Sequence, residues 1–338
     1  MRRGVSAGLL FAGLVLLLAV ATLLSLSFGA TRLDLAAVLD RTSAQDLAIL
    51  VHERLPRTVL AVLVGAALSC AGLAFQAVLV NPLADPYIIG VSGGAAIGGT
   101  LAILAPFGLE RLGVSASAFV FALAAILLTY SLSRDRTGRV RAYEVLLIGV
   151  VFNAFASAVI MFLKAVVRAE KAQEMLLWLM GTLSSEVRGW DVIAATAAVI
   201  GVAFLGLMRI APSLNALALG EEDAAGVGVD PVRTMRAVFL GGSLLVAAAV
   251  SVSGLIGFVG LIVPHAVRLL LGSDHRLTLP AGAIAGAAFL VLADLASRVL
   301  FPVFETEAPV GVLTALIGGP VFVVILKRRF GPIGTARR

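Results

Sequence analysis

Arg54-Leu-Pro-Arg57 opens the most informative stretch of this chain. An apolar segment of membrane-spanning length follows from residue 58 to residue 80. Next come Asn81-Pro-Leu-Ala-Asp-Pro86 and the small-residue run Gly90-Val-Ser-Gly-Gly-Ala-Ala-Ile-Gly-Gly99. A charged end, a span, a polar break and a close-packing helix therefore follow one another with almost no linker. A structural anchor needs no polar break, whereas a protein that passes something through a membrane could use every part.

The composition is that of a membrane protein. The chain has 338 residues, of which 60% are hydrophobic and 14% charged, and its mean hydropathy is +1.06. Soluble domains lie near half apolar and a quarter charged. The net charge of +6 does not indicate a nucleic-acid partner, because much of the excess arginine lies in short loops and at the chain ends, where it sets membrane orientation.

Apolar runs of spanning length recur along the whole chain and predict an all-α membrane protein, because only helices satisfy their own backbone polar groups in lipid. We expect about ten spans, near residues 5–28, 58–80, 87–106, 114–132, 143–165, 191–208, 235–252, 255–271, 279–297 and 309–326. The first run is longer than the roughly 7–15 residues of a signal-peptide core, so we expect a retained helix. No loop exceeds about 30 residues, so there is no room for a soluble catalytic domain, and we expect a single polytopic transmembrane domain over 1–338.

Basic residues predict the orientation. With ten crossings, most of the loop and terminal arginines and lysines fall on one side, which is cytoplasmic by the positive-inside rule. These residues are Arg2, Arg3, Arg134, Arg136, Arg139, Arg141, Arg209, Arg233, Arg236, Lys327, Arg328, Arg329, Arg337 and Arg338. Both termini are then cytoplasmic, and segment 29–57 is external, with its arginines offset by acidic residues.

Two loops have helical character. The outer loop from Arg168 to Trp190 carries an apolar run between charged ends and predicts a short amphipathic surface helix. The inner loop, about 213–233, contains Gly220 as a break, followed by three acidic residues that favour a helix N-terminus. We expect two short helices there, on the cytoplasmic face.

Small residues and polar residues inside spans are the remaining patterns. Pairs such as Gly94 with Gly98 and Gly282 with Gly286 let helices approach closely, and we expect intrachain packing from them. The segment Asn81–Pro86 breaks a helix, because proline lacks a backbone donor. It is either a plain turn or irregular backbone beside a water-filled path, and the motif alone leaves both interpretations open.

Arginines at the predicted outer ends of spans have two interpretations. Arg54 and Arg57 are three residues apart, so a helix would place them on one face, and Arg298 lies near Asp294. These arginines either pair locally and snorkel or form a positive outer rim that docks an acidic partner. Gln76 and Asn153 are polar residues within spans, and such residues are functional candidates.

Several chemistries have no sequence support. The single Cys70 excludes an intrachain disulfide, and the three histidines show no metal-ligand spacing, so we expect no metal site and no cofactor. No lysine follows a glycine, so the chain has no Walker-type phosphate-binding loop. If ATP drives this protein, another subunit binds the ATP.

Taken together, the motifs resemble the FecCD or type II ABC importer permeases, which take up iron–siderophores, haem and cobalamin. The matching segments are Arg54-Leu-Pro-Arg57, Gly72-Leu-Ala-Phe-Gln76, Asn81-Pro-Leu-Ala-Asp-Pro86, Gly90-Val-Ser-Gly-Gly94, Leu217-Ala-Leu-Gly-Glu-Glu222, Gly257-Phe-Val-Gly-Leu-Ile-Val-Pro-His265, Asp274-His-Arg276 and Pro309-Val-Gly-Val-Leu-Thr-Ala-Leu-Ile-Gly-Gly-Pro320. They cover nearly the whole chain in family order.

The resemblance implies a homodimer with the path between its copies, two cytoplasmic ATPase subunits, a periplasmic or lipid-anchored binding protein, and a bacterial inner-membrane location. It implies that Arg54, Arg57 and Arg298 dock the binding protein. The implied gate or path residues are Gln76, Asn81, Leu83, Tyr143 and Asn153. The implied ATPase-coupling residues are Leu217, Gly220, Glu221, Glu222, Ala224 and Gly228.

One gate element departs from the family pattern. Relatives can have small hydroxyl residues before the fifth span, where this chain has Ala142-Tyr143-Glu144. The leading hypothesis is a permease, not itself an enzyme, that moves a bulky metal chelate inward by alternating access. An iron–siderophore or cobalamin is favoured over haem. The alternative is an ion-coupled secondary transporter, which needs acidic carriers at mid-membrane, whereas Asp85 and Asp294 both lie at predicted span ends.

Overall fold

The computed structural model of the chain describes residues 7–29, 43–104, 112–135, 140–183, 189–300 and 307–330. Several residues used above to predict the orientation lie outside these ranges. They are Arg2, Arg3, Arg136, Arg139, Arg337 and Arg338.

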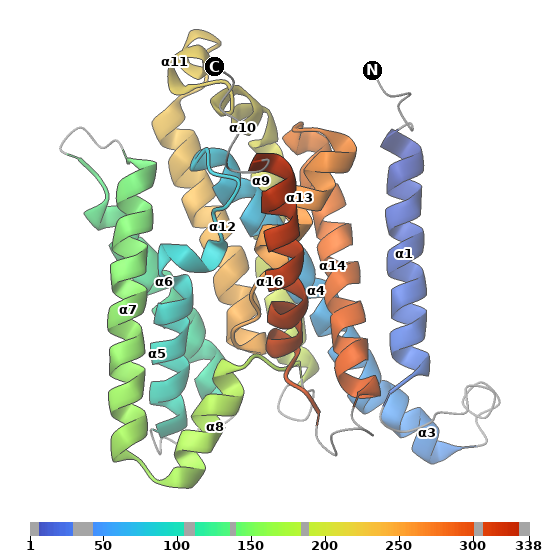
Figure 1. The fold of residues 1–338 in the computed structure, drawn as a ribbon. Helices are drawn as coiled ribbons and strands as arrows, with labels where there is room; N and C mark the ends of the chain where they lie inside the picture. Colours follow the sequence, from blue (N-terminus) through green and yellow to red (C-terminus); the bar gives the residue numbers. More distant parts are fainter. Residues whose placement is uncertain are drawn as a thin grey trace.

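The described chain is helical, apart from one isolated bridge between Arg134 and Val140. Figure 1 shows the helices as a bundle whose long members run roughly parallel or antiparallel. Their bounds are α1 Ala7–Ser27, α3 Ala44–Ile49, η1 Leu50–Arg54, α4 Leu55–Val78, η2 Pro86–Ile89, α5 Val91–Leu104, α6 Leu112–Leu132, α7 Ala142–Val166, α8 Ala169–Leu179, α9 Trp190–Arg209, α10 Ala211–Leu217, α11 Glu221–Gly226, α12 Pro231–Ser253, α13 Val259–Leu271, α14 His275–Val299 and α16 Val310–Phe330.

The predicted membrane fold is confirmed. Within the described ranges, seven helices are long and apolar enough to cross a membrane, and three shorter apolar helices occupy the remaining predicted spans. The predicted start of the second span at residue 58 is wrong. The helix already begins at Ala44 and continues through the π-helical turn η1 into α4, so part of the segment expected to be an external loop is helical.

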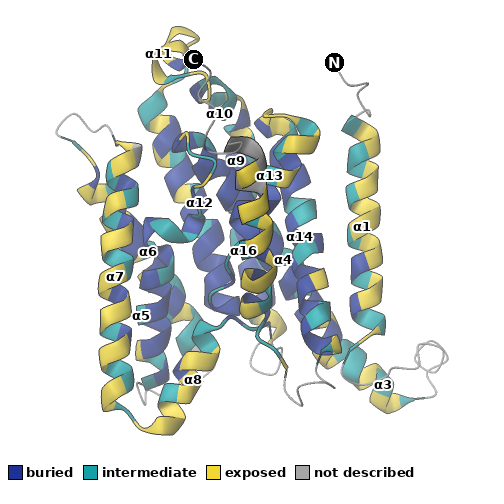
Figure 2. Ribbon diagram, in the orientation of Figure 1, coloured by how far each residue is buried: buried dark blue, intermediate teal, exposed yellow. Residues whose placement is uncertain are grey.

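Helix α4 forms the centre of the core and packs against α14, α12 and α13. Glycines make these contacts close: a Cβ on Gly65 would strike the backbone of Gly286 in α14, and one on Gly72 would strike that of Gly260 in α13. Gly94 and Gly98 likewise face α6, so the predicted intrachain use of small residues is confirmed. Figure 2 shows α4 buried, whereas α1, α7 and α16 expose one side. Their exposed side chains are largely apolar, as expected of a surface that faces lipid.

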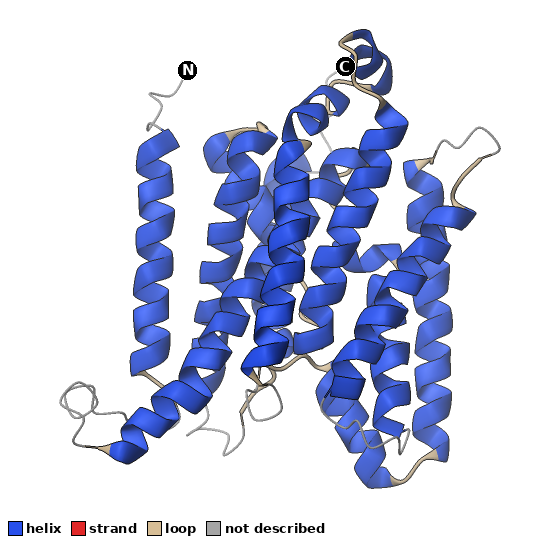
Figure 3. Ribbon diagram, turned by 180° about the vertical axis from the view of Figure 1, so that it is seen from behind, coloured by secondary structure: helices blue, strands red, loops and turns tan. Residues whose placement is uncertain are grey.

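The surface helices separate the two ends of the bundle. Helices α10 and α11 lie at one end, together with the first turn of α1 and the last turn of α16 (Figures 1 and 3). The amphipathic helix predicted between residues 168 and 190 is present as α8. It lies at the opposite end, on the same side as α3 (Figure 1).

Candidate functional site

The Asn81–Pro86 segment interrupts the bundle between α4 and α5. Helix α4 ends at Val78, and regular structure resumes with η2, which Asp85 caps by accepting a hydrogen bond from the Tyr87 backbone at 2.8 Å. Val80 has a φ of 47° and Gly90 one of 97°, so the backbone turns sharply on both sides of the break. Proline at positions 82 and 86 and glycine at 90 explain why no continuous helix forms here.

Gln76 fastens this break to α13. Its side chain is buried, and its amide nitrogen donates to the carbonyls of Ala84 and Gly260, each at 3.2 Å. Arg268 of α13 donates to the Gln76 amide oxygen. The side chain of Gln76, a predicted path residue, therefore links α4 to the break and to α13 by hydrogen bonds.

Asn153 of α7 makes a similar link by hydrogen bonds. Its side-chain nitrogen donates to the Tyr87 carbonyl at 2.9 Å, and its oxygen accepts from the Gly93 backbone at 3.1 Å. A Cβ on Gly93 would collide with Asn153, so glycine is needed at this contact. Helix α7 is thereby joined to both η2 and the first turn of α5.

A second break lies between α12 and α13, and the sequence analysis did not select it as a site. Gly254 and Phe258 both have positive φ, at 66° and 68°. Phe258 and Val80 are the non-glycine residues with this strained conformation in the described ranges, one in each break. The Tyr87 hydroxyl accepts a hydrogen bond from the Ile256 backbone at 3.1 Å and so links the two breaks directly. The sequence feature that could have indicated this link is Tyr87, which directly follows a segment that contains two prolines.

The other predicted gate residues lie nearer the surface. Asn81 accepts a hydrogen bond from the Leu83 backbone at 3.0 Å, which stabilises the turn, while the Leu83 side chain is 38% exposed. Tyr143 projects from the first turn of α7 and is 73% exposed. Their gate roles stay predictions.

The three predicted docking arginines gather at the opposite end, where α1, α4 and α14 meet. All three are buried. Arg57 pairs with Asp294 at 2.8 Å and with Glu307 at 2.7 Å. Arg298 pairs with Asp294 at 3.1 Å and donates to Ser25 of α1, while Arg54 donates to the Leu26 carbonyl at 2.8 Å.

In this arginine cluster, the carboxylates of Asp294 and Glu307 pair with Arg57 and Arg298, and Glu53 and Asp46 act electrostatically on Arg54. Asp294 is fully buried, whereas the Glu307 side chain is 41% exposed. Ion pairing of Asp294 was anticipated only with Arg298, four residues away in the same helix. The docking role stays a prediction, to be tested against a structural role in joining three helices.

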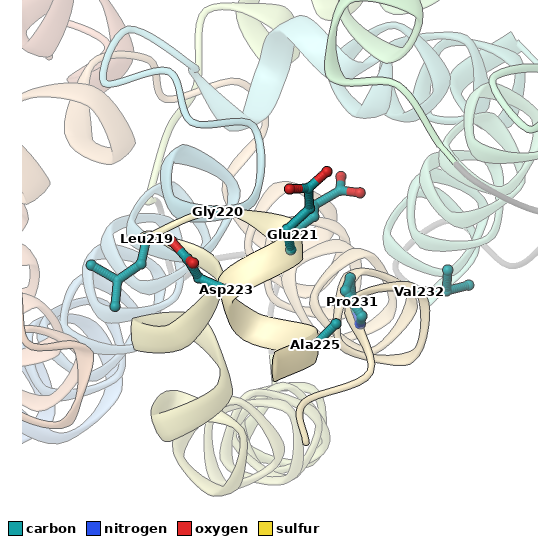
Figure 4. Close-up of a pocket in the computed structure, with 8 residues that line it drawn as sticks. Leu219, Gly220, Glu221, Asp223, Ala225, Pro231 and Val232 are labelled. Atoms are coloured by element: carbon teal, nitrogen blue, oxygen red, sulfur yellow. The ribbon is translucent and has the colours of Figure 1, made fainter. Parts of the chain in front are cut away.

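The predicted coupling residues form the α10–α11 end. Leu217 of α10 and Ala224 of α11 are buried, and the two short helices are in contact. Gly220 adopts a φ of 132° between them. A hollow of about 560 Å³ lies beside it, lined in part by Glu221 and Glu222 (Figure 4). The hollow is open and acidic, which suits a basic partner surface.

Two exposed apolar side chains at this end were missed by sequence reasoning. Leu219 and Val227 are 76% and 73% exposed, on either side of α11. Gly228, with a φ of 83°, follows Val227 and turns the chain towards α12. Exposed apolar residues within a polar rim are typical of protein contacts, and only the fold shows that these two escape the core.

Asn215 connects α10 to the first turn of α14. Its side chain donates to Asp274 at 2.6 Å and accepts from the His275 backbone at 2.8 Å. The hydrogen bond from Asn215, helped by the Arg276 backbone, lowers the pKa of the Asp274 carboxyl. Asn215 therefore ties α10 to the N-terminus of α14, the helix that also carries Asp294 and Arg298 at its far end.

No group of three or more metal-ligating side chains occurs in the described ranges. The geometry has instead the features of a membrane permease: an all-helical bundle, two interrupted helices that meet inside it, and surface helices tied to a spanning helix.

The chain matches the FecCD transport family over residues 17–328 and belongs to that family. It is 44% identical over 276 residues to the cobalamin import system permease protein BtuC of Halobacterium salinarum, covering 82% of this chain and 72% of that protein. It is 38% identical over 322 residues to the hemin transport system permease protein HmuU of Yersinia pestis, covering 94% of each.

A solved structure agrees. A metal-chelate type ABC transporter in an inward-facing conformation superposes with a TM-score of 0.83 at 33% identity, over 95% of this chain and 99% of that one. The chain is therefore a multi-pass permease of the ABC importer class.

Proposed function

We propose that two copies of this chain form the path of an ABC importer that carries a bulky metal chelate into the cytoplasm. Separate ATPase subunits bind at the α10–α11 end, and a substrate-binding protein docks at the arginine-cluster end. Both termini are cytoplasmic, in a bacterial inner membrane. ATP hydrolysis takes place on the ATPase subunits, and this chain supplies the path.

One observation carries the proposal: side chains from two different helices, α4 and α7, hold the Asn81–Pro86 break and its flanks by hydrogen bonds. Gln76 links it to α13 and Asn153 links it to α7. Packed elements with two discrete arrangements give alternating access, whereas a static opening would leak. The Tyr87–Ile256 hydrogen bond makes the two breaks move together.

The link from Asn215 to α14 supports the proposal that the ATPase subunits bind at the α10–α11 end. A partner that displaces α10 would pull on the N-terminus of α14 through Asp274 and His275. The exposed Leu219 and Val227 supply apolar contact, and Glu221 and Glu222 supply charge. These features fit a partner surface with an apolar groove and basic edges.

We infer the substrate class from the names of related permeases. The names of similar permeases include cobalamin, hemin and iron chelatin. One other relative is named for molybdate. We favour cobalamin or an iron–siderophore over haem, with selection performed by the binding protein.

An ion-coupled secondary transporter is disfavoured by the contacts of its two candidate carriers. Asp294 is paired with two arginines, and Asp85 caps η2. A carboxylate that already has fixed cationic or backbone partners is a poor shuttle for protons or sodium ions.

Uptake by reconstituted vesicles tests the mechanism. We expect transport of a chelate only when a co-expressed ATPase and ATP are both present. Uptake that continues in ATP-depleted vesicles under a proton gradient would overturn the proposal in favour of ion coupling.

Docking is tested by two substitutions of opposite sign. Arg54→Gln should weaken association with the binding protein, because it removes a positive charge at the cluster. Glu307→Gln should strengthen this association, because the Glu307 carboxylate pairs with Arg57 in the isolated chain and offsets its charge. Surface plasmon resonance at two salt concentrations gives both affinities. Unchanged affinity in both variants would assign the cluster a structural role alone.

A further inference from the structure

An apolar groove between α6 and α12 lies outside the site described above. It has a volume of about 430 Å³. Leu123, Ile126 and Leu127 line it from α6, and Phe239, Leu240 and Leu244 line it from α12. Leu127 and Leu240 are more than half exposed at its edges, whereas Ile126 and Phe239 form its buried floor.

The groove ends in two arginines. Arg134 follows the last turn of α6 and Arg236 lies in the second turn of α12, and both line the same cavity. Both are exposed, and neither has an ion pair within the described part of the chain. The other arginine in this turn region, Arg233, is instead paired with Asp230 at 3.1 Å. Two uncompensated cations therefore face one end of an apolar channel.

Tyr130 supplies a second, independent observation. Its ring packs against Phe239 with ring centroids 5.3 Å apart, and the Arg134 guanidinium lies 5.8 Å from the Tyr130 ring centroid. Its hydroxyl is buried and has no hydrogen-bond partner in the described structure. What the Tyr130 ring offers at this end of the groove is an aromatic face beneath the Arg134 guanidinium.

The dimensions match one lipid leaflet. At about 1.5 Å per residue, Leu132 at the end of α6 lies about 14 Å along the helix from Leu123, and Arg134 follows two residues later. Half of the hydrocarbon core is about 15 Å thick. An acyl chain that follows the groove would thus place its headgroup between Arg134 and Arg236.

We infer that this groove binds an anionic phospholipid, with its phosphate between Arg134 and Arg236 and beside the Tyr130 ring. Basic pockets between spanning helices on the cytoplasmic side are suited to such headgroups. A second groove, formed by α6, α9 and α12, shows the contrast, because it is lined by Asp191 of α9 and by no arginine. The inference uses the membrane orientation proposed above but not the transport activity, so its failure and that of the transport proposal can be told apart.

The test is native mass spectrometry of the full chain, delipidated in detergent and titrated with dioleoylphosphatidylglycerol or dioleoylphosphatidylcholine. We expect one tightly bound phosphatidylglycerol and weaker binding of phosphatidylcholine. The Arg134→Gln, Arg236→Gln double variant should bind phosphatidylglycerol roughly 30-fold more weakly, about fivefold for each arginine. The matched control is Arg209→Gln, Arg233→Gln, which removes the same charge outside the groove and should keep wild-type affinity.

A third variant addresses the apolar half of the site. Leu240→Trp fills the groove from an exposed position and should lower phosphatidylglycerol binding while both arginines remain. Equal loss in the charge control, equal binding of the two lipids, or no effect of Leu240→Trp would overturn the inference. Displacement of the lipid by millimolar inorganic phosphate would also overturn it, because the site would then recognise a free anion.

Discussion

At the scale of single residues, the Asp294 carboxylate is held in place by ion pairs in the interior of the bundle. It is fully buried and holds two arginines, one of them 237 positions away in sequence. A buried ion pair gains little over an apolar replacement, but removal of one partner leaves an uncompensated charge. Substitution of Asp294 should therefore lower the stability of the folded chain.

We predict that Asp294→Asn lowers the free energy of unfolding by about 3–5 kcal/mol, because Arg57 and Arg298 lose their shared carboxylate. Thermal unfolding in detergent measures the change. The control is Glu174→Gln, which breaks the exposed Lys171–Glu174 pair and should cost less than about 1 kcal/mol. Equal effects of the two substitutions would contradict a structural role for the buried pair.

At the scale of elements, close helix approach depends on a few glycines. We predict that Gly72→Ala destabilises the chain by about 1–3 kcal/mol, because its Cβ would meet the Gly260 backbone and push α4 from α13. Gly206→Ala in α9 is the matched control, since nothing lies within 4 Å of its new Cβ. The control should be neutral or slightly stabilising. Unfolding midpoints that fall equally in both would argue against close packing as the cause.

The α10–α14 link has a defined pH dependence. The pKa of Asp274 is lower in the folded chain than its ordinary value near 3.9, so its contribution is complete above that value and is lost as pH falls towards the folded pKa. We expect Asp274→Asn to lower the unfolding midpoint at pH 6, with the difference from wild type shrinking as pH falls below the ordinary aspartate value near 3.9. Glu222→Gln serves as the control on the same face. A difference that persists at low pH would mean that the charge of Asp274 is not responsible.

These elements also show what could be predicted from sequence. Spans, the α10–α11 break at Gly220 and the Asn81–Pro86 interruption depend on local composition, so the pattern predicts them directly. The Tyr87–Ile256 and Arg57–Asp294 contacts join segments 169 and 237 positions apart. They depend on how α4, α13 and α14 pack, which no local pattern encodes. The burial of the arginine cluster was missed for the same reason.

At the scale of the whole molecule, the proposed path between two copies requires a particular face. Helix α7 contacts η2 and carries Asn153, and α16 packs through Gly318 onto Phe258 of the second break. Both helices expose apolar side chains, including Phe155 and Leu316 at 61% and 65%. Helix α1 is equally exposed but packs mainly on α14, away from both breaks. If the copies meet across the path, they meet on the face that carries α7 and α16.

Cysteine cross-linking distinguishes these faces, because the single native thiol, Cys70, is buried and unreactive. We predict that cysteines placed singly at Val312, Leu316 and Val323 of α16 include at least one that yields a cross-linked dimer with a short bifunctional thiol reagent in membranes. Leu16→Cys on α1 has similar exposure and should stay monomeric on denaturing gels. Dimers from Leu16→Cys alone would place the partner on the opposite face, and the two breaks would then have to enclose a path within one copy.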